Sequence, residues 1–191
     1  MDSNSKKGFM PFSLTALIII LDQAAKAFIV ANWPLQNTII WPRLPGMKIE
    51  DIYNKAFLVF WHVRNKAIAF SLGTEIPQPY RVALFVIIPI VVLVFLTWYY
   101  FNTSEFNQIQ RWAIAGIIGG GLSNIIDRIF RPDGVVDFIS VKFYGLFGLS
   151  RWPTFNIADA SVVICCIILL LTIMLAPRQR HTTNQRRFHN E

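Results

Sequence analysis

The sequence is poor in charged residues. Only 15% of its 191 residues are Asp, Glu, Lys or Arg, whereas 54% are hydrophobic. An ordinary soluble domain carries about a quarter charged residues, so this balance argues against a soluble fold. We therefore predict an integral membrane protein.

Histidine and cysteine are also scarce. His62, His181 and His189 all lie outside the long apolar runs, and the two cysteines, Cys165 and Cys166, are adjacent within the last run. The sequence contains no H-E-x-x-H, no metal-type cysteine spacing and no G-x-x-x-x-G-K-[ST]. We predict no metal and no cofactor, and we interpret both cysteines as packing residues.

The net charge of +7 does not indicate nucleic acid as a partner, because much of the excess lies in residues 177–191. A basic tail of this kind is typical of a disordered segment near anionic lipid headgroups. We predict a cytoplasmic, disordered tail, with membrane lipids rather than nucleic acid as its surroundings.

Four stretches are long and apolar enough to cross a bilayer, which takes about 20 residues. A cleaved signal peptide is the alternative for the first, but its apolar core meets Asp22 and Gln23 where a cleavage site would lie, and apolar sequence then resumes. We predict an all-α membrane fold with a small β element, whose helices span residues 12–33, 80–101, 111–130 and 154–176.

Orientation follows from the positions of the basic residues, which collect at cytoplasmic helix ends. They precede the first and third spans and follow the fourth. With four crossings, these three ends lie on the same side of the membrane. Both termini are therefore predicted to be cytoplasmic. The residues that support this are Lys6, Lys7, Arg111, Arg178, Arg180, Arg186 and Arg187.

Two outward-facing elements are expected beside the helices. Residues 57–64 are rich in aromatic and β-branched side chains, which predicts a strand within a β-cradle of about residues 34–75. Residues 143–152, between the third and fourth spans, are aromatic and contain Gly145 and Gly148. We predict that they form a flap at headgroup depth.

Two aspartates stand out near the outer ends of the spans. Asp137 follows the third span, and Asp159 lies about 7.5 Å below the start of the fourth at 1.5 Å per residue. Retaining ionised groups near lipid is costly, so such residues often have a function. A close pair of carboxyls that shares one proton can activate water and protonate the oxygen of an amide. The alternative is a pair of helix-end carboxylates bound to basic neighbours.

The other polar residues of the spans have structural explanations. Asp22 and Lys26 are four residues apart and can neutralise one another on one helix face. Asp127 and Arg128 can anchor the end of the third span, and Asn124 can form a hydrogen bond between helices. For each of these residues, both the structural role and a role in function remain possible interpretations of the sequence.

Five blocks of the sequence, in order over residues 22–159, give it a resemblance to the bacterial lipoprotein signal peptidase family. They place aspartates, asparagines and one arginine at defined points on the four spans. The blocks read DQAAK at 22–26, NKAIAFS at 65–71, GGGLSNIIDR at 119–128, VVDF at 135–138 and PTFNIAD at 153–159.

The resemblance implies an aspartyl endopeptidase of the bacterial plasma (inner) membrane, with its site near the outer, periplasmic face. Its substrates would be diacylglyceryl-modified prolipoproteins, cut before the lipidated cysteine. By motif match Asp137 and Asp159 are the catalytic pair. The resemblance implies that the remaining motif residues line or support the substrate site, namely Asn65, Asn124, Arg128, Asn156, Asp22, Lys26 and Asp127.

The sequence departs from the family pattern at two positions. Ala67 and Ser123 stand where the family usually has glycine. Each adds bulk where a backbone can approach another group closely. The departures concern the shape near Asn65 and Asn124 rather than the aspartate pair.

The whole pattern predicts one membrane peptidase domain over residues 1–176, working as a monomer. A small proton- or cation-coupled transporter is the alternative from another class, with Asp22, Asp127 and Asp159 as a relay. A noncatalytic homologue that binds lipoproteins is a third possibility. The clustering of the polar motif residues toward one end of the spans favours the peptidase over the transporter.

Overall fold

The computed structural model describes residues 8–35, 39–42, 46–66, 77, 80 and 83–175. The predicted tail at 177–191, Ala67 and the last part of the predicted β-cradle lie outside these residues.

Four helices of the described chain are long and apolar enough to cross a membrane. They are α1 (Phe12–Asn32), a π-helical turn η2 (Ala83–Ile87) that continues into α4 (Ile88–Asn102), α5 (Gln108–Phe130) and α6 (Ile157–Met174). The four predicted spans are confirmed, and the chain is a multi-pass membrane protein.

The starts of α5 and α6 are set by capping boxes. The Asn107 side chain accepts from the Gln110 backbone, and Gln110 returns a bond to Asn107. Asn156 and Asp159 exchange the same pair of bonds at the start of α6. These reciprocal bonds satisfy N–H groups that a helix start leaves unpaired. As a result α5 begins three residues before its predicted start and α6 three residues after.

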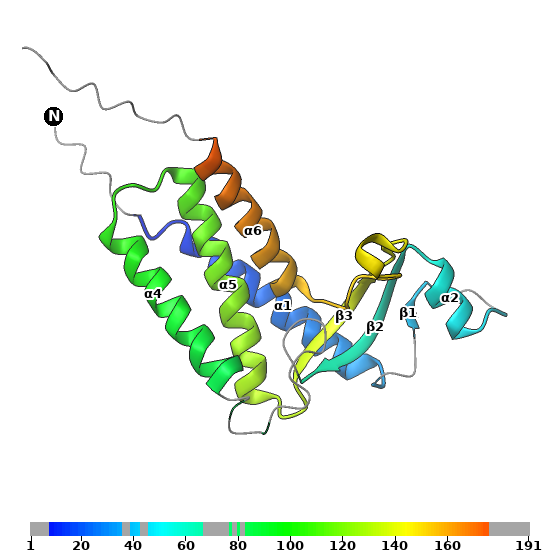
Figure 1. Cartoon of the computed structure of the whole chain (residues 1–191). Helices are drawn as coiled ribbons and strands as arrows, with labels where there is room; N and C mark the ends of the chain where they lie inside the picture. Colours follow the sequence, from blue (N-terminus) through cyan, green and yellow to red (C-terminus); the bar gives the residue numbers. More distant parts are fainter. Residues whose placement is uncertain are drawn as a thin grey trace, which may run out of the picture.

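Helix α5 is the centre of the bundle, and the other three helices pack against it (Figure 1). Its glycines permit this close approach. A Cβ at Gly119 would lie 3.0 Å from the Cα of Thr15 in α1, and one at Gly120 would overlap the carbonyl oxygen of Ala158 in α6. The α5 backbone therefore comes close to both neighbours, as small residues allow in membrane helices.

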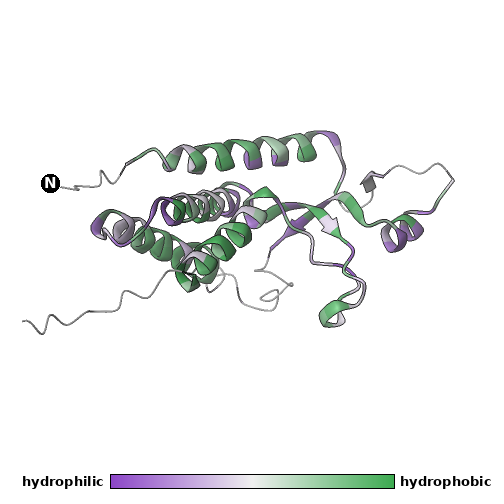
Figure 2. Ribbon diagram, turned by 90° about the horizontal axis from the view of Figure 1, so that it is seen from above, coloured by the Kyte–Doolittle hydropathy of each residue, from purple (hydrophilic) through white to green (hydrophobic). Residues whose placement is uncertain are grey.

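The outer faces of the helices are apolar. Large hydrophobic side chains of α4 and α6, such as Val91, Phe95, Val163 and Ile164, are more than half exposed. Figure 2 shows this hydrophobic colouring along the bundle, while the two charged residues of α1, Asp22 and Lys26, are buried. This arrangement suits a protein whose solvent is lipid.

A three-stranded antiparallel sheet adjoins one end of the bundle, in the order β1 (Ile39–Trp41), β2 (Leu58–Asn65), β3 (Val135–Val141). Strand β2 confirms the strand predicted at 57–64. The sheet is not built from the loop after α1 alone, because β3 follows α5. The short helix α2 (Ile49–Lys55), between β1 and β2, was not predicted either.

The sheet is fixed to the bundle by apolar packing. Ile29 of α1 packs with Val136 and Phe138 of β3 in a buried cluster. The backbone of Phe155, just before α6, pairs with Ile139 of β3. Strand β3 is thus held between the ends of α1 and α6, which determines where Asp137 lies.

Candidate active site

Asp137 lies in the middle of β3, opposite Val63 of β2. Its side chain is only 2% exposed. It accepts hydrogen bonds from Asn65 Nδ2 at 3.0 Å and from Asn156 Nδ2 at 2.7 Å. A buried carboxylate needs such donors, and two of the predicted site residues supply them.

Asp159 lies in the first turn of α6. Its Oδ1 accepts from Asn124 Nδ2 at 2.7 Å, and its Oδ2 accepts from the backbone N–H of Asn156 at 3.2 Å. The positive end of the helix dipole also favours a negative charge at this position. Each carboxyl oxygen of Asp159 therefore has a hydrogen-bond donor.

One residue, Asn156, binds both aspartates. Its side chain donates to Asp137, and its backbone N–H donates to Asp159. The same Nδ2 also donates to Asn124 Oδ1 at 3.2 Å. Asp137 and Asp159 are thus joined through two side-chain amides, although they come from a strand and a helix. The prediction that the two aspartates lie close together agrees with these bonds.

The Asp137 carboxyl has an unusual proton affinity. Burial first, and then the negative charge of Asp159, raise the pKa of Asp137 to about 7. The hydrogen bonds from Asn65 and Asn156 act in the opposite direction. A carboxyl with this pKa is about half protonated near neutral pH, so it can both give and take a proton.

Behind the two aspartates lies a fully buried cluster centred on Lys26. Its Nζ lies 2.6 Å from Asp22 and 2.9 Å from Asp127, and donates to Asn124 Oδ1 at 2.9 Å. The side chains of Lys26, Asp22 and Asp127 are all 0% exposed. The pairing of Asp22 with Lys26 expected from the sequence is confirmed, and Asp127 joins it.

The cluster determines how Asn124 is oriented. Lys26 offers only donors, so the atom of Asn124 that faces it must be the carbonyl oxygen. The Nδ2 of Asn124 then points to Asp159. Lys26 therefore acts on the aspartate pair indirectly, through one amide.

Asp127 links the same cluster to the sheet. One of its oxygens accepts from the Val136 backbone N–H at 3.2 Å, and the other accepts from Arg131 and from Gln23. Val136 immediately precedes Asp137. Asp127 therefore holds the strand that carries Asp137 against α5.

Ser123 and Gln23 belong to this cluster, although no site role was predicted for them. Ser123 Oγ donates to Asp22 at 2.7 Å, and Gln23 Nε2 donates to Ser123 Oγ at 3.0 Å. Asp22 also accepts from the Ala158 backbone N–H at 3.0 Å. The Ser123 side chain thus forms a hydrogen bond at a position where the family usually has glycine. No local sequence signal marked it, since its partner is 101 residues away.

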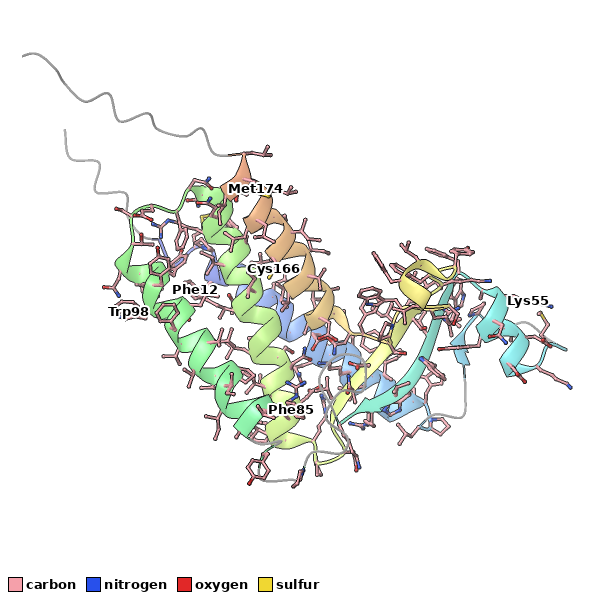
Figure 3. The ribbon with its side chains drawn as sticks, in the orientation of Figure 1. Phe12, Lys55, Phe85, Trp98, Cys166 and Met174 are labelled. Carbon is pink, nitrogen blue, oxygen red and sulfur yellow. The ribbon has the colours of Figure 1, made fainter. Side chains whose placement is uncertain are left out.

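Arg128 lies one turn after Asn124, near the C-terminal end of α5. Its Nη1 donates to the Phe85 carbonyl oxygen at 3.1 Å, and its guanidinium lies 5.7 Å from the centre of the Phe85 ring. Figure 3 shows labelled Phe85 beside that end of α5, and polar side chains gathered between α1, α5 and the start of α6. Arg128 therefore ties α5 to η2 at the edge of this polar region.

The arrangement suits the hydrolysis of an amide. One carboxyl is poised to hold a proton near neutral pH, and the other lies at a helix start that favours its ionised form. Such a pair can activate water and protonate an amide oxygen together.

Residues 14–175 match the family described as Signal peptidase (SPase) II. The chain is also similar to the lipoprotein signal peptidases of three organisms. That of Treponema denticola is 42% identical over 91% of this chain and 93% of its own length. That of Treponema pallidum is 40% identical over 84% and 80%, and that of Borrelia hermsii 48% over 78% and 79%.

A solved bacterial membrane enzyme has the same fold. The two chains superpose with a TM-score of 0.69, over 95% of this chain and 94% of the other, at 24% identity. A likeness at this identity establishes the architecture alone.

Proposed function

The chain belongs to the signal peptidase II family, aspartic peptidases that remove signal peptides from prolipoproteins, and we propose that Asp137 and Asp159 are the catalytic groups with which it does so. The observation that carries this proposal is the double attachment of Asn156, which binds both carboxyls. A carboxyl pair held by one residue has the fixed geometry that proton transfer requires.

We assign the shared proton to Asp137 and the negative charge to Asp159. Asp137 is almost completely buried and has a pKa of about 7. Asp159 accepts hydrogen bonds from Asn124 and from the start of α6, which favours the charged form at that position. This division gives one acid and one base from two residues of the same type.

In the first step Asp159 takes a proton from water as the water oxygen bonds to the peptide carbonyl carbon. Asp137 gives its proton to the carbonyl oxygen, so that a neutral gem-diol forms. In the second step Asp159 passes its proton to the amide nitrogen while Asp137 recovers one from a gem-diol hydroxyl. The C–N bond then breaks, and the pair returns to its starting state with one proton between them.

The polar groups around the pair would orient the substrate. Asn65, Asn124 and Asn156 already bind the carboxyls and lie where a peptide backbone must pass. Arg128 adds positive charge at the edge of the same region. We assign these four residues to the substrate site and Asp22, Lys26 and Asp127 to its support.

The substrates are assigned as diacylglyceryl-modified prolipoproteins, cut before the lipidated cysteine. The position of the pair supports this. It lies at the end of the bundle away from the start of α1 and the end of α6 (Figure 1), near apolar helix faces along which acyl chains could lie. With both termini cytoplasmic, the site opens at the outer face of the bacterial plasma membrane, and substrate enters sideways. We assign the whole activity to one domain, residues 1–176, acting as a monomer.

The test compares purified wild type with Asp137→Asn and Asp159→Asn on a diacylated prolipoprotein, in lipid nanodiscs. Each variant should lose at least about a thousandfold in kcat, because each removes one proton-transfer group. Asp51→Asn, at an exposed aspartate of α2, is the matched control and should cut at the wild-type rate. Mass spectrometry of the product should give a new N-terminus at the lipidated cysteine.

Two results would contradict the proposal. If both Asp137→Asn and Asp159→Asn keep the wild-type rate, the assignment of these two aspartates as the catalytic dyad is wrong. If wild type leaves the substrate intact under conditions where it binds it, the chain is a noncatalytic homologue. A thermal unfolding curve for each variant separates loss of chemistry from loss of fold.

A further inference from the structure

We propose that the tip of the flap, formed by Tyr144, Leu146 and Phe147, is a lipid-binding surface that inserts into the outer interface of the bilayer. The flap is residues 143–152, between β3 and α6. This proposal does not depend on the catalytic roles of Asp137 and Asp159. It assigns to a defined part of the structure a contact with phospholipid outside the four membrane-spanning helices.

The tip exposes large apolar side chains outside those helices. Tyr144 is 73% exposed, Leu146 55% and Phe147 82%. Residues 143–150 contain no charged side chain. A water-soluble loop rarely presents three such residues together, whereas aromatic residues are enriched at the lipid–water interface.

Several backbone N–H groups of the tip are hydrogen-bonded within the flap. Gly145 N–H donates to Leu149 O, Leu146 N–H to Phe143 O, and Gly148 N–H to Gly145 O, at 2.9 to 3.0 Å. The Leu149 and Phe143 N–H groups are likewise bonded inside the flap. A segment that enters an apolar layer has to pair its own backbone groups, and five N–H groups of this flap are paired within it.

The backbone is also held in an unfavourable shape that presents these side chains. Tyr144 has a φ of 55° and Phe147 a φ of 53°, in the left-handed region that non-glycine residues seldom occupy. Gly145 and Gly148, at 85° and 77°, complete the curl. Retained strain of this kind points to a use for the conformation, and here it turns two aromatic rings outward.

The flap is attached rigidly at its base, which argues against a loose lid. Arg151 is 8% exposed and donates to the carbonyl oxygens of Tyr53 and Ala56, at 2.7 and 2.8 Å. It also binds Ser140 O at 2.7 Å, and Lys142 Nζ donates to Asn54 O at 2.8 Å. Two cations thus bind the carbonyls at the end of α2, where the helix dipole favours them.

The position of the flap favours lipid as its partner. In Figure 1 the flap, drawn in yellow, turns to the side of the bundle near the start of α6 instead of continuing past the helix ends. Figure 2 likewise shows it standing away from the sheet, with a hydrophobic tip. Because the helices cross a bilayer, a lateral projection at this level meets the headgroup region. The apolar surface of the spans would then continue onto the tip.

The experiment measures the immersion depth of the tip with spin labels. Cys165→Ala and Cys166→Ala remove the cysteines of the chain, and Phe147→Cys or Leu146→Cys then carries the label in phosphatidylethanolamine–phosphatidylglycerol nanodiscs. Glu50→Cys on α2 is the water-exposed control, and Val163→Cys on α6 the lipid-exposed one. Collision rates are measured with oxygen, which enters lipid, and with a nickel chelate, which stays in water.

We expect the ratio of the oxygen collision rate to the nickel collision rate at Phe147 and Leu146 to be at least fivefold above the ratio at Glu50. It should approach the ratio at Val163. A ratio equal to that at Glu50 at both positions would overturn the proposal. A raised oxygen-to-nickel ratio that is seen only when prolipoprotein is added would also overturn the proposal, because the tip would then contact substrate. Neither result bears on the dyad, which the Asp137→Asn and Asp159→Asn assays test separately.

Discussion

Two groups of buried or half-buried carboxylates lie next to each other in this protein and differ in their partners. Asp22 and Asp127 share the ammonium group of Lys26, and Arg131 adds a second positive charge at Asp127. In the described part of the chain, the hydrogen bonds that reach Asp137 and Asp159 come instead from neutral amides. In the first group two carboxylates are paired with two cations. In the second group neutral amides bind the carboxyls, so the protonation of these carboxyls can change more easily.

This difference matches the proposed division into a supporting group and a catalytic pair. A buried ion pair keeps its charges, because losing either partner leaves the other uncompensated. A carboxyl held by amides can change its charge at a smaller cost, which proton transfer requires. The two groups meet at Asn124, which binds Lys26 with its oxygen and Asp159 with its nitrogen.

Removing the positive centre of the first group gives the largest expected change in the comparison. Lys26→Met would leave Asp22 and Asp127 buried with one cation fewer, so we expect a loss of about 3–5 kcal/mol in unfolding free energy. Lys55→Met, at the exposed lysine labelled in Figure 3, is the matched control and should leave stability within about 0.5 kcal/mol. Denaturation in mixed micelles measures both.

The double variant Lys26→Met with Asp22→Asn sharpens this prediction. It removes one charge of each sign, so it should recover part of the lost stability. If Lys26→Met alone is as stable as wild type, the first group is not held together by charge, and the contrast between the groups fails.

The pH dependence of cleavage probes the second group. With the pKa of Asp137 near 7, loss of its proton at higher pH should lower kcat/KM about tenfold per pH unit above that value. Asn65→Ala removes a donor that favours the ionised form, so the pKa rises and the alkaline limb should move to higher pH. A rate profile measured at every half pH unit tests this. An unchanged limb, or one displaced to lower pH, would contradict the assignment.

The variant Ser123→Ala has the smallest expected effect. It should change the stability that the first group provides without changing the activity assigned to the second group. Ser123→Ala deletes the hydrogen bond to Asp22, and we expect a loss of about 1–2 kcal/mol in stability. Because Ser123 does not touch either dyad carboxyl, kcat/KM should stay within about threefold of wild type at pH 7. A hundredfold fall in kcat with an unchanged Tm would instead connect Ser123 to the chemistry.

Much of this organisation could be predicted from the sequence. The four spans follow from apolar length, and β2 follows from its aromatic and β-branched residues. The pairing of Asp22 with Lys26 is a local contact at i and i+4, which sequence spacing reveals directly. The motif blocks also selected Asn65, Asn124 and Asn156, which the structure brings to the two aspartates.

The remaining features depend on contacts between distant residues. Strand β3 is a short apolar run directly after a helix, and only its pairing with β2 identifies it as part of the sheet. Arg151 binds carbonyl groups about 95 residues earlier in the chain. Nothing near it in the sequence indicates that role. Ser123 and Gln23 were missed for the same reason.

The capping box at the start of α6 gives Asp159 a second task during turnover. The oxygen that accepts the Asn156 backbone N–H belongs to the carboxyl that takes a proton from water in the proposed mechanism. A protonated carboxyl is a weaker acceptor, so the first helical turn loosens when the intermediate forms. It tightens again when the departing nitrogen removes that proton. In the proposed mechanism, the hydrogen bond that caps α6 thus weakens and re-forms once in every catalytic cycle.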